Sequence, residues 1–360
     1  MTQGAAGAAG SPPAIEFGIF DWMDRGALDL GAQYQQRLAM LAVAEETGFY
    51  CYHLAEHHGT PLGLAPSPSV FLAAAAARTE RIRLGPLVYL LSLYNPVRLL
   101  EEICMLDHLS GGRLDLGVGR GISPFELATL NVDIAESRAI FHEALEIVLA
   151  GLATGEVDHQ GHYFTFNKVT IPLRPVQRPY PPLWYPTSNA ESVPWIAEHG
   201  FHTLFGMASL DAIREQRAVY ERIFAAHKSD AGRLNGQVAA PKFGMNRLVY
   251  VAETDARAQA EAKAAYPRFF QNFEYLWALN GDHRYDELSD FDRRLARGGV
   301  LVGSPETVRA QVAACLKETG CNYFVGAFAW GTLSTEQVVT SVRLFGEAVI
   351  PTFRAAAVAP

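Results

Sequence analysis

Cysteine is scarce in this chain, with four residues among 360: Cys51, Cys104, Cys315 and Cys321. They lie in apolar or strand-like surroundings without short paired spacing, which excludes a zinc knuckle and a disulfide framework and predicts reduced core thiols. Long hydrophobic runs are lacking as well. No stretch approaches the roughly 20 uninterrupted apolar residues that span a membrane, so we expect no membrane segment.

Charged residues are also few, at 19% of the chain, and their formal balance is -8. This balance excludes a broad basic surface, so we expect no nucleic acid and no anionic membrane as a partner. Residues 1–14 lack the basic start and long apolar run of a signal peptide. We therefore expect a cytoplasmic protein with a flexible N-terminal tail over residues 1–14.

What the chain has in abundance is alternation of strand-like and helix-like segments. The strand-like segments are 15–20, 49–54, 82–88, 113–119, 182–185, 202–205, 243–251 and 322–328. Alternation at this pace is typical of parallel strands joined by crossover helices. Eight such units predict an α/β fold, an eight-stranded TIM-type (β/α) barrel that forms a single domain over residues 15–360.

Two segments interrupt this rhythm. Residues 157–171 place aromatic residues beside polar ones, which predicts an inserted hairpin. Residues 280–299 are rich in Asp and Arg and end in two glycines, so we expect a mobile loop before the last helix-strand-helix segment. Its few apolar groups and its length favour a lid that closes over a site.

Polar residues follow the predicted strands at the end where TIM-type barrels carry their sites. Arg120 follows the fourth strand, and Arg138 begins the next helix. Ser188, Asn189 and Ser192 surround a later helix start, where free N–H groups attract anions. A guanidinium offers a rigid fork of donors to phosphate, although an arginine beside a turn can equally pair with a surface carboxylate.

Several motifs then occur in a specific order and spacing. They are Ala44-Glu45-Glu46-Thr47-Gly48-Phe49, Glu56-His57-His58, Asn95-Pro96-Val97-Arg98, Asp107 to Arg113, Gly119-Arg120-Gly121, Ser137-Arg138 and Val302-Gly303-Ser304-Pro305. This succession resembles the bacterial luciferase-like flavin-dependent monooxygenases, and most closely the luciferase alpha-chain branch. The resemblance covers the chain from Ile15 to about Phe353.

The resemblance implies a two-component monooxygenase. Reduced FMN comes from a separate flavin reductase, and molecular oxygen is used to oxygenate a small organic substrate through a flavin hydroperoxide. Arg120 and Arg138 match the family's FMN-phosphate arginines. Ser188, Asn189 and Ser192 fall in its phosphate-holding loop. His57 matches its histidine for oxygen chemistry and is the expected acid/base.

Three further positions are assigned to the flavin ring by the same resemblance. Leu87-Val88 fall where the family has a non-prolyl cis peptide behind the ring. Gly119 replaces the reactive cysteine of luciferase, which predicts a roomier ring pocket and argues against light emission from a long-chain aldehyde. The substrate is left open among an aldehyde, a ketone and a terpene-like hydrocarbon.

Trp22, Phe328 and Trp330 lie near predicted strand ends and are candidates for the substrate pocket, although large aromatic residues also fill barrels. The alanine run from Ala73 to Ala77 favours close helix approach and, with the resemblance, predicts a homodimer. Alternatives are a deazaflavin-dependent oxidoreductase of the same fold, a non-catalytic flavin-binding protein, and a barrel hydrolase with a metal on His57 and His58. No convincing third metal ligand accompanies these histidines, so we expect no metal.

Overall fold

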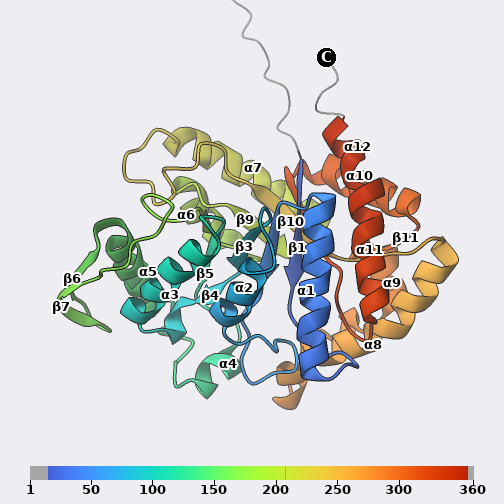
Figure 1. Ribbon diagram of the computed structural model, residues 1–360, viewed down its shortest axis with the longest axis horizontal. Coiled ribbons are helices and arrows are strands. Elements are labelled where there is room, and N and C mark those ends of the chain that lie inside the picture. Colours follow the sequence, from blue (N-terminus) through green and yellow to red (C-terminus); the bar gives the residue numbers. More distant parts are fainter. Residues whose placement is uncertain (1–14, 207, 356–360) are drawn as a thin grey trace, which may run out of the picture.

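The computed structural model describes residues 15–206 and 208–355. The tail predicted for residues 1–14 lies outside the described residues. Within them the chain folds as parallel strands surrounded by helices (Figure 1). The prediction of a parallel α/β fold is confirmed; the strands form a curled parallel sheet, and the eight-stranded barrel stays a prediction.

The strands form two parallel sheets that meet at both edges. One contains β1 (Glu16–Asp21), β2 (Cys51–Leu54), β3 (Arg83–Pro86), β9 (Thr203–Gly206), β10 (Phe243–Val251), β11 (Val300–Gly303) and β12 (Tyr323–Ala327). The other contains β4 (Tyr89–Leu90), β5 (Leu116–Gly119) and β8 (Leu183–Trp184). Isolated parallel bridges from Leu84 to Leu114 and from Trp184 to His202 join the two sheets. The carboxyl ends of the strands therefore point to one end of the molecule.

The helices cover the outside of the strands. They are α1 (Leu30–Thr47), α2 (Pro68–Ala76), α3 (Pro96–Leu109), α4 (Pro124–Thr129), α5 (Ser137–Thr154), α6 (Val193–Glu198), α7 (Leu210–His227), α8 (Asp255–Leu279), α9 (Phe291–Ala296), α10 (Pro305–Thr319), α11 (Thr335–Ala348) and α12 (Ile350–Ala355). Three short 3-10 turns accompany them: η1 (Leu91–Leu93), η2 (Ala190–Ser192) and η3 (Asp286–Leu288). Helix α1 lies beside α11, so the first and last parts of the fold are neighbours (Figure 1).

Local sequence explains where the long helices begin. Asn95 caps α3 by accepting hydrogen bonds from the N–H groups of Val97 and Arg98, and Pro96 occupies the first helical position. Thr254 caps α8 in the same manner through the N–H of Arg257. Caps of this kind fix where a helix starts, and their residue types are visible in the sequence.

Strands β6 (Glu156–Gln160) and β7 (Thr165–Thr170) form an antiparallel pair between α5 and β8. The pair projects from the body of the molecule, at the left of Figure 1. It lies within the stretch where the sequence predicts a hairpin.

Residues 280–299, predicted as a mobile loop, contain more regular structure than a loop would. This segment contains η3 and α9, and Phe291 and Arg294 on α9 are buried. Phe291 packs on Tyr266 of α8, with ring centroids 5.5 Å apart, and the Tyr266 hydroxyl donates to the carbonyl of Leu288 at 2.5 Å. One apolar contact and one hydrogen bond therefore hold this highly charged segment on α8. Its role as a lid stays a prediction.

Strand β10 has an unusual pairing that shapes the site. One edge pairs with β12, while the other pairs first with β9 and then, from Leu248 onward, with β11. Between β10 and β11 the chain forms α8, η3 and α9. This segment leaves the sheet at the end of β10 and returns to it at the neighbouring strand, β11. It packs over the carboxyl end of β1, where Trp22 contacts Phe269 at 5.3 Å between ring centroids.

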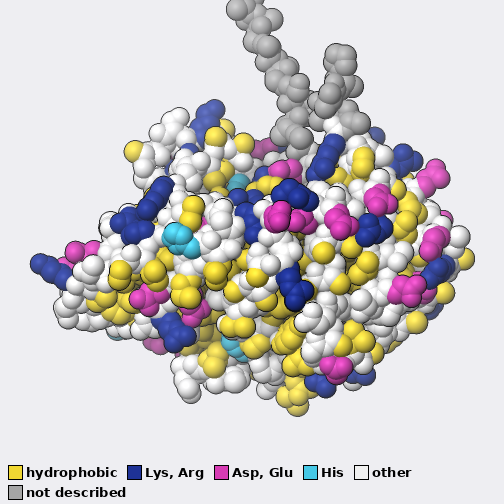
Figure 2. Space-filling model, in the orientation of Figure 1, with side chains coloured by type: hydrophobic (Ala, Val, Ile, Leu, Met, Phe, Trp, Pro, Cys, Tyr) yellow, Lys and Arg dark blue, Asp and Glu magenta, His cyan; other side chains and the backbone are white. Residues whose placement is uncertain are grey.

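All four cysteines are buried and free, as predicted. Acidic and basic side chains alternate with apolar ones on the face drawn in Figure 2. No helix among residues 15–206 and 208–355 combines the length and the hydropathy of a membrane span.

Candidate active site

Three predicted site residues, and Tyr185, which the sequence did not indicate, follow the carboxyl ends of neighbouring strands. His57 comes after β2, Val88 after β3, Arg120 after β5 and Tyr185 after β8. Parallel register brings these ends to one level, with Leu54 opposite Pro86 and Leu90 opposite Gly119. The candidate site is thus built on the ends of rigid strands.

Arg120, Arg138 and Ser192 line a single cavity of about 180 Å³. The other residues that line it are Phe141, His142, Tyr185, Glu191 and Trp195. Ser188 and Asn189 are exposed and are not among the lining residues. The Asn189 side chain instead accepts a hydrogen bond from the N–H of Glu191 and caps η2, so its predicted part in this cavity is not supported.

The two arginines carry positive charge into this cavity. Arg120 Nη1 lies 3.3 Å from the Ser137 hydroxyl, and Arg138 occupies the first turn of α5. Within residues 15–206 and 208–355, no carboxylate oxygen lies within 4.0 Å of either guanidinium, unlike the surface pair Arg98–Glu102 at 3.2 Å. Pairing with a surface carboxylate, the alternative left open by the sequence, is not what the described residues show.

Aromatic rings form the wall of the cavity, and the sequence did not single them out. Phe141 and His142 lie three and four residues after Arg138, on the same face of α5. Trp195 packs on Tyr185 and His142 with ring centroids 5.6 Å and 5.3 Å away. Burial raises the pKa of Tyr185, although the charges of Arg120 and Arg138 oppose this shift. Helical spacing from Arg138 is the signal that could have identified Phe141 and His142.

His57 is held by a carboxylate that the sequence did not indicate. Its Nδ1 lies 3.0 Å from Glu126 Oε1, which also accepts from the His58 N–H at 2.8 Å. Burial opposes ionisation of Glu126, but the charge of His57 and these hydrogen bonds outweigh it and lower the Glu126 pKa. Glu126 sits on the short helix α4, whose start is marked by Ser123 and Pro124. That Ser-Pro-x-Glu sequence is the available signal.

His58 has a separate partner. Its Nε2 lies 2.8 Å from Glu56 Oε1, and this hydrogen bond raises the His58 pKa. Glu56 is buried, which raises its own pKa, and its second oxygen accepts from the Leu90 N–H at 3.1 Å. Glu56 therefore links the loop after β2 to β4, and His58 supports Glu56 in that position. In the described part of the chain no group of three or more His, Cys, Asp or Glu side chains is arranged to hold a metal ion.

The Leu87–Val88 peptide bond is cis, in agreement with the expectation from the resemblance. The expectation of a roomier space at Gly119 is wrong. A Cβ added at Gly119 would lie 2.7 Å from Val88 Cγ2, so Val88 already fills the space that a side chain at 119 would take. Glycine is required here because β5 passes close to the turn after β3.

The three aromatic pocket candidates divide. Trp22 directly follows β1 and lines a second cavity. Phe328 and Trp330 are buried and line neither of the two cavities described here, so their place in a substrate pocket stays a prediction. Phe328 packs edge-on against Phe345 of α11, and Trp330 donates to the Val249 carbonyl at 3.3 Å. Both fill the interior between strands and helices.

Comparison with known proteins agrees with this geometry. The family described as luciferase-like monooxygenase matches residues 15–323. A protein of Sinorhizobium fredii named y4wF is 38% identical over 89% of this chain and 92% of its own length. The oxygenase component of a flavin-dependent trigonelline monooxygenase from Acinetobacter baylyi is 25% identical over 74% and 72%.

Among solved structures, the monooxygenase RslO1 from Streptomyces bottropensis superimposes with a TM-score of 0.83 and 28% identity, covering 94% of this chain and 100% of that one. The match of sequence and fold extends over most of the molecule. The chain belongs to the luciferase-like monooxygenase family.

Proposed function

We propose that this protein is the oxygenase component of a two-component FMN-dependent monooxygenase. Reduced FMN would come from a separate flavin reductase, and molecular oxygen would be used to oxygenate a small organic substrate. The trigonelline monooxygenase relative supports the two-component part, because its name describes it as the oxygenase component of a flavin-dependent enzyme.

The observation that carries the proposal is the meeting of Arg120, Arg138 and Ser192 in one cavity. Two guanidinium groups and a hydroxyl form a donor set suited to a phosphate dianion. Because Arg138 lies in the first turn of the 18-residue helix α5, the helix dipole adds positive potential there. The aromatic wall supplies an apolar surface beside the charged group. These residues fit the phosphate end of FMN.

In this proposal bound reduced FMN supplies the electrons with which oxygen is activated. His57 moves the proton. If ionised Glu126 accepts a hydrogen bond from His57 Nδ1–H, the free Nε2 is left to exchange a proton with the reacting groups. Glu126 is then a positioning residue, since it fixes the tautomer and orientation of the imidazole.

The test is anaerobic titration with reduced FMN. We expect Arg120→Ala and Arg138→Ala each to weaken binding by about 1.5 to 3 kcal/mol, the range for hydrogen bonds to charged groups. Arg98→Ala is the matched control, because Arg98 is exposed and pairs only with Glu102. Unchanged affinity in both cavity variants would remove the basis of the assignment. Parallel titration with a reduced deazaflavin separates FMN from the deazaflavin alternative.

A further inference from the structure

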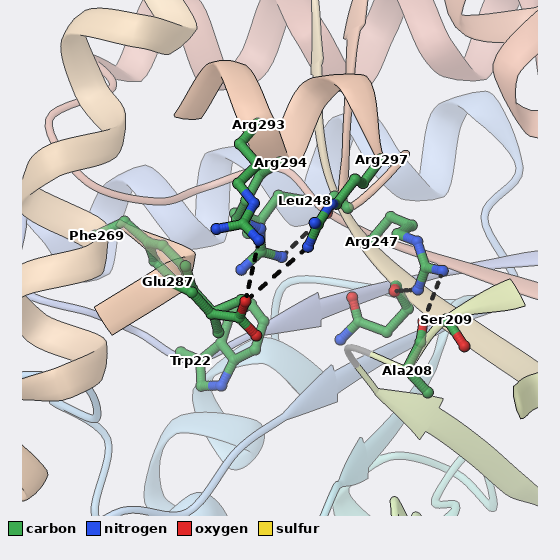
Figure 3. Close-up of a pocket in the computed structure, with 13 residues that line it drawn as sticks. Trp22, Ala208, Ser209, Arg247, Leu248, Phe269, Glu287, Arg293, Arg294 and Arg297 are labelled. Carbon is green, nitrogen blue, oxygen red and sulfur yellow. Dashed lines mark hydrogen bonds and ion pairs between the residues drawn. The ribbon is translucent and has the colours of Figure 1, made fainter. Parts of the chain in front are cut away.

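A second cavity of about 280 Å³ lies where the segment between β10 and β11 covers the end of β1 (Figure 3). Four apolar side chains line it, Trp22, Leu248, Phe269 and Leu288, together with a strongly basic set; Trp22 lies opposite Arg293, Arg294 and Arg297 (Figure 3). The basic set consists of Arg247, Arg293, Arg294 and Arg297. Glu287 is the single acidic residue among those that line the cavity. The combination is unexpected in a chain whose formal charge is -8.

Two of these arginines are buried without a counter-ion. Arg247 is 4% exposed, and its guanidinium donates only to the carbonyls of Gly298, Asn246 and Ala208, at 2.8, 2.8 and 3.0 Å. Arg294 is 8% exposed and donates to the Gly299 carbonyl at 3.2 Å. Over residues 15–206 and 208–355, neither guanidinium has a carboxylate oxygen within 4.0 Å.

The one carboxylate is already shared. Glu287 lies 3.4 Å from Arg293 and 4.0 Å from Arg297, both of which are exposed at the rim. The inner pair, Arg247 and Arg294, thus keeps its full positive charge. Burial lowers the pKa of Arg247, and the charge of Arg294 acts in the same direction, yet a guanidinium stays protonated in proteins. Burying such a charge without a partner is unfavourable, so an anion that enters the cavity gains a strong interaction.

We infer that this cavity binds the anionic group, a carboxylate, of an organic acid whose apolar body rests on Trp22 and Phe269. The inference rests on the proposed function, because it gives the substrate of the flavin-dependent reaction this chemical class. The Arg120 and Arg138 cavity takes the flavin phosphate, which leaves the second basic cavity for a second anion. The fork of Arg294 and the apolar wall opposite it select an acid over its neutral analogue.

Benzoate and its neutral analogue benzamide are the probes. Thermal denaturation at constant ionic strength measures binding, since a ligand that binds only the folded protein raises its melting temperature. We expect a saturable increase with benzoate and little with benzamide. Arg294→Met and Arg247→Met should each weaken the apparent benzoate affinity about tenfold or more, as expected for the loss of a charged hydrogen bond. Arg268→Met, an exposed arginine on α8, should respond as the parent does.

Two results with benzoate would overturn the inference. Equal shifts with benzoate and benzamide in the parent protein overturn the inference, as does a parental benzoate response in both folded Met variants. Reduced FMN titration forms the second arm. If Arg294→Met lost FMN affinity instead, the cavity would belong to the flavin phosphate and the inference would be wrong. If the parent failed to bind FMN but still bound benzoate, the proposed function would fail while the anion site stood.

Discussion

Gly119 lies so close to Val88 that a side chain at position 119 would clash with it. Its absence of a Cβ suggested open space, but Val88 Cγ2 would lie 2.7 Å from that Cβ. We predict that Gly119→Ala destabilises the fold by about 1 to 3 kcal/mol, the usual cost of overpacking. Urea unfolding measures this cost.

The same position offers an internal control. In a Val88→Ala background the added methyl at position 119 has room, so the cost of Gly119→Ala should largely disappear. An equal cost in both backgrounds would mean that the clash with Val88 is not its cause.

His53 gives the molecule a pH dependence. It is fully buried inside the strands, with Nε2 2.8 Å from the Tyr323 hydroxyl. Burial, followed by the charges of Arg83 and Lys242, lowers its pKa from 6.5 to about 3. Between pH 6.5 and about 3, His53 is protonated in the unfolded chain but neutral in the folded protein. The free energy of unfolding therefore falls as pH falls through this range.

We therefore predict that His53→Gln flattens the acid limb of the stability curve by up to about 1.4 kcal/mol per pH unit. Gln keeps a hydrogen-bonding group for Tyr323 but does not titrate. His162→Gln, a change at an exposed histidine, is the control. Urea unfolding at several pH values gives the comparison, and identical acid limbs for parent and His53→Gln would contradict the prediction.

Helix α9 is a short element held on α8 by few side chains. Phe291 is 6% exposed and anchors this six-residue helix on α8. We predict that Phe291→Ala speeds amide hydrogen exchange over residues 291–297 while the strands keep their protection, because short, locally packed units open independently. Phe291→Leu, which retains an apolar anchor, should show a smaller effect. Equal acceleration in β1 and β12 would show that α9 does not open alone.

Sequence patterns located the elements that carry strong local signals. Asn95 and Thr254, which cap α3 and α8, are residue types that mark helix starts in a sequence. Helix α9 was missed because its order comes from contacts with α8, which no local pattern reveals. Strand β11 was missed because only four residues separate Gly299 from the next helix cap.

The candidate site was predictable to a similar degree. Arg120, Arg138 and His57 stand in motifs that the sequence displays, but their partners come from distant segments. Glu126 reaches His57 across 69 residues of chain, and Arg247 lies inside a strand whose pattern signals only burial. Contacts between residues far apart in the chain could not be predicted from local sequence patterns.

For the whole molecule, association is the property that most needs measurement. Helices α2 and α3 lie side by side and expose Val70, Met105 and Leu109, which are 72%, 54% and 59% accessible. Apolar side chains at such exposure favour burial in an interface. We predict a homodimer, with a light-scattering mass twice the 39.4 kDa of one chain.

Val70→Glu combined with Met105→Glu should give the monomer mass, whereas Leu279→Glu, an equally exposed apolar position on α8, should leave the dimer intact. A parent protein of 39.4 kDa at micromolar concentration would end the dimer prediction.

The pairing of β10 with β11 has a consequence for divergence. Strands β10 and β11 are neighbours, with Val251 opposite Gly303, so residues 252–299 leave the sheet from one strand and return to it at the next. We call residues 252–299 the cassette. This cassette supplies seven of the 13 residues that line the 280 Å³ cavity, Phe269, Glu287 and Arg294 among them, and none of the residues around Arg120 and Arg138. Exchange of the cassette between relatives would alter one cavity and leave the other untouched. Substitutions in the cassette can therefore change what the 280 Å³ cavity binds without changing the cavity around Arg120 and Arg138.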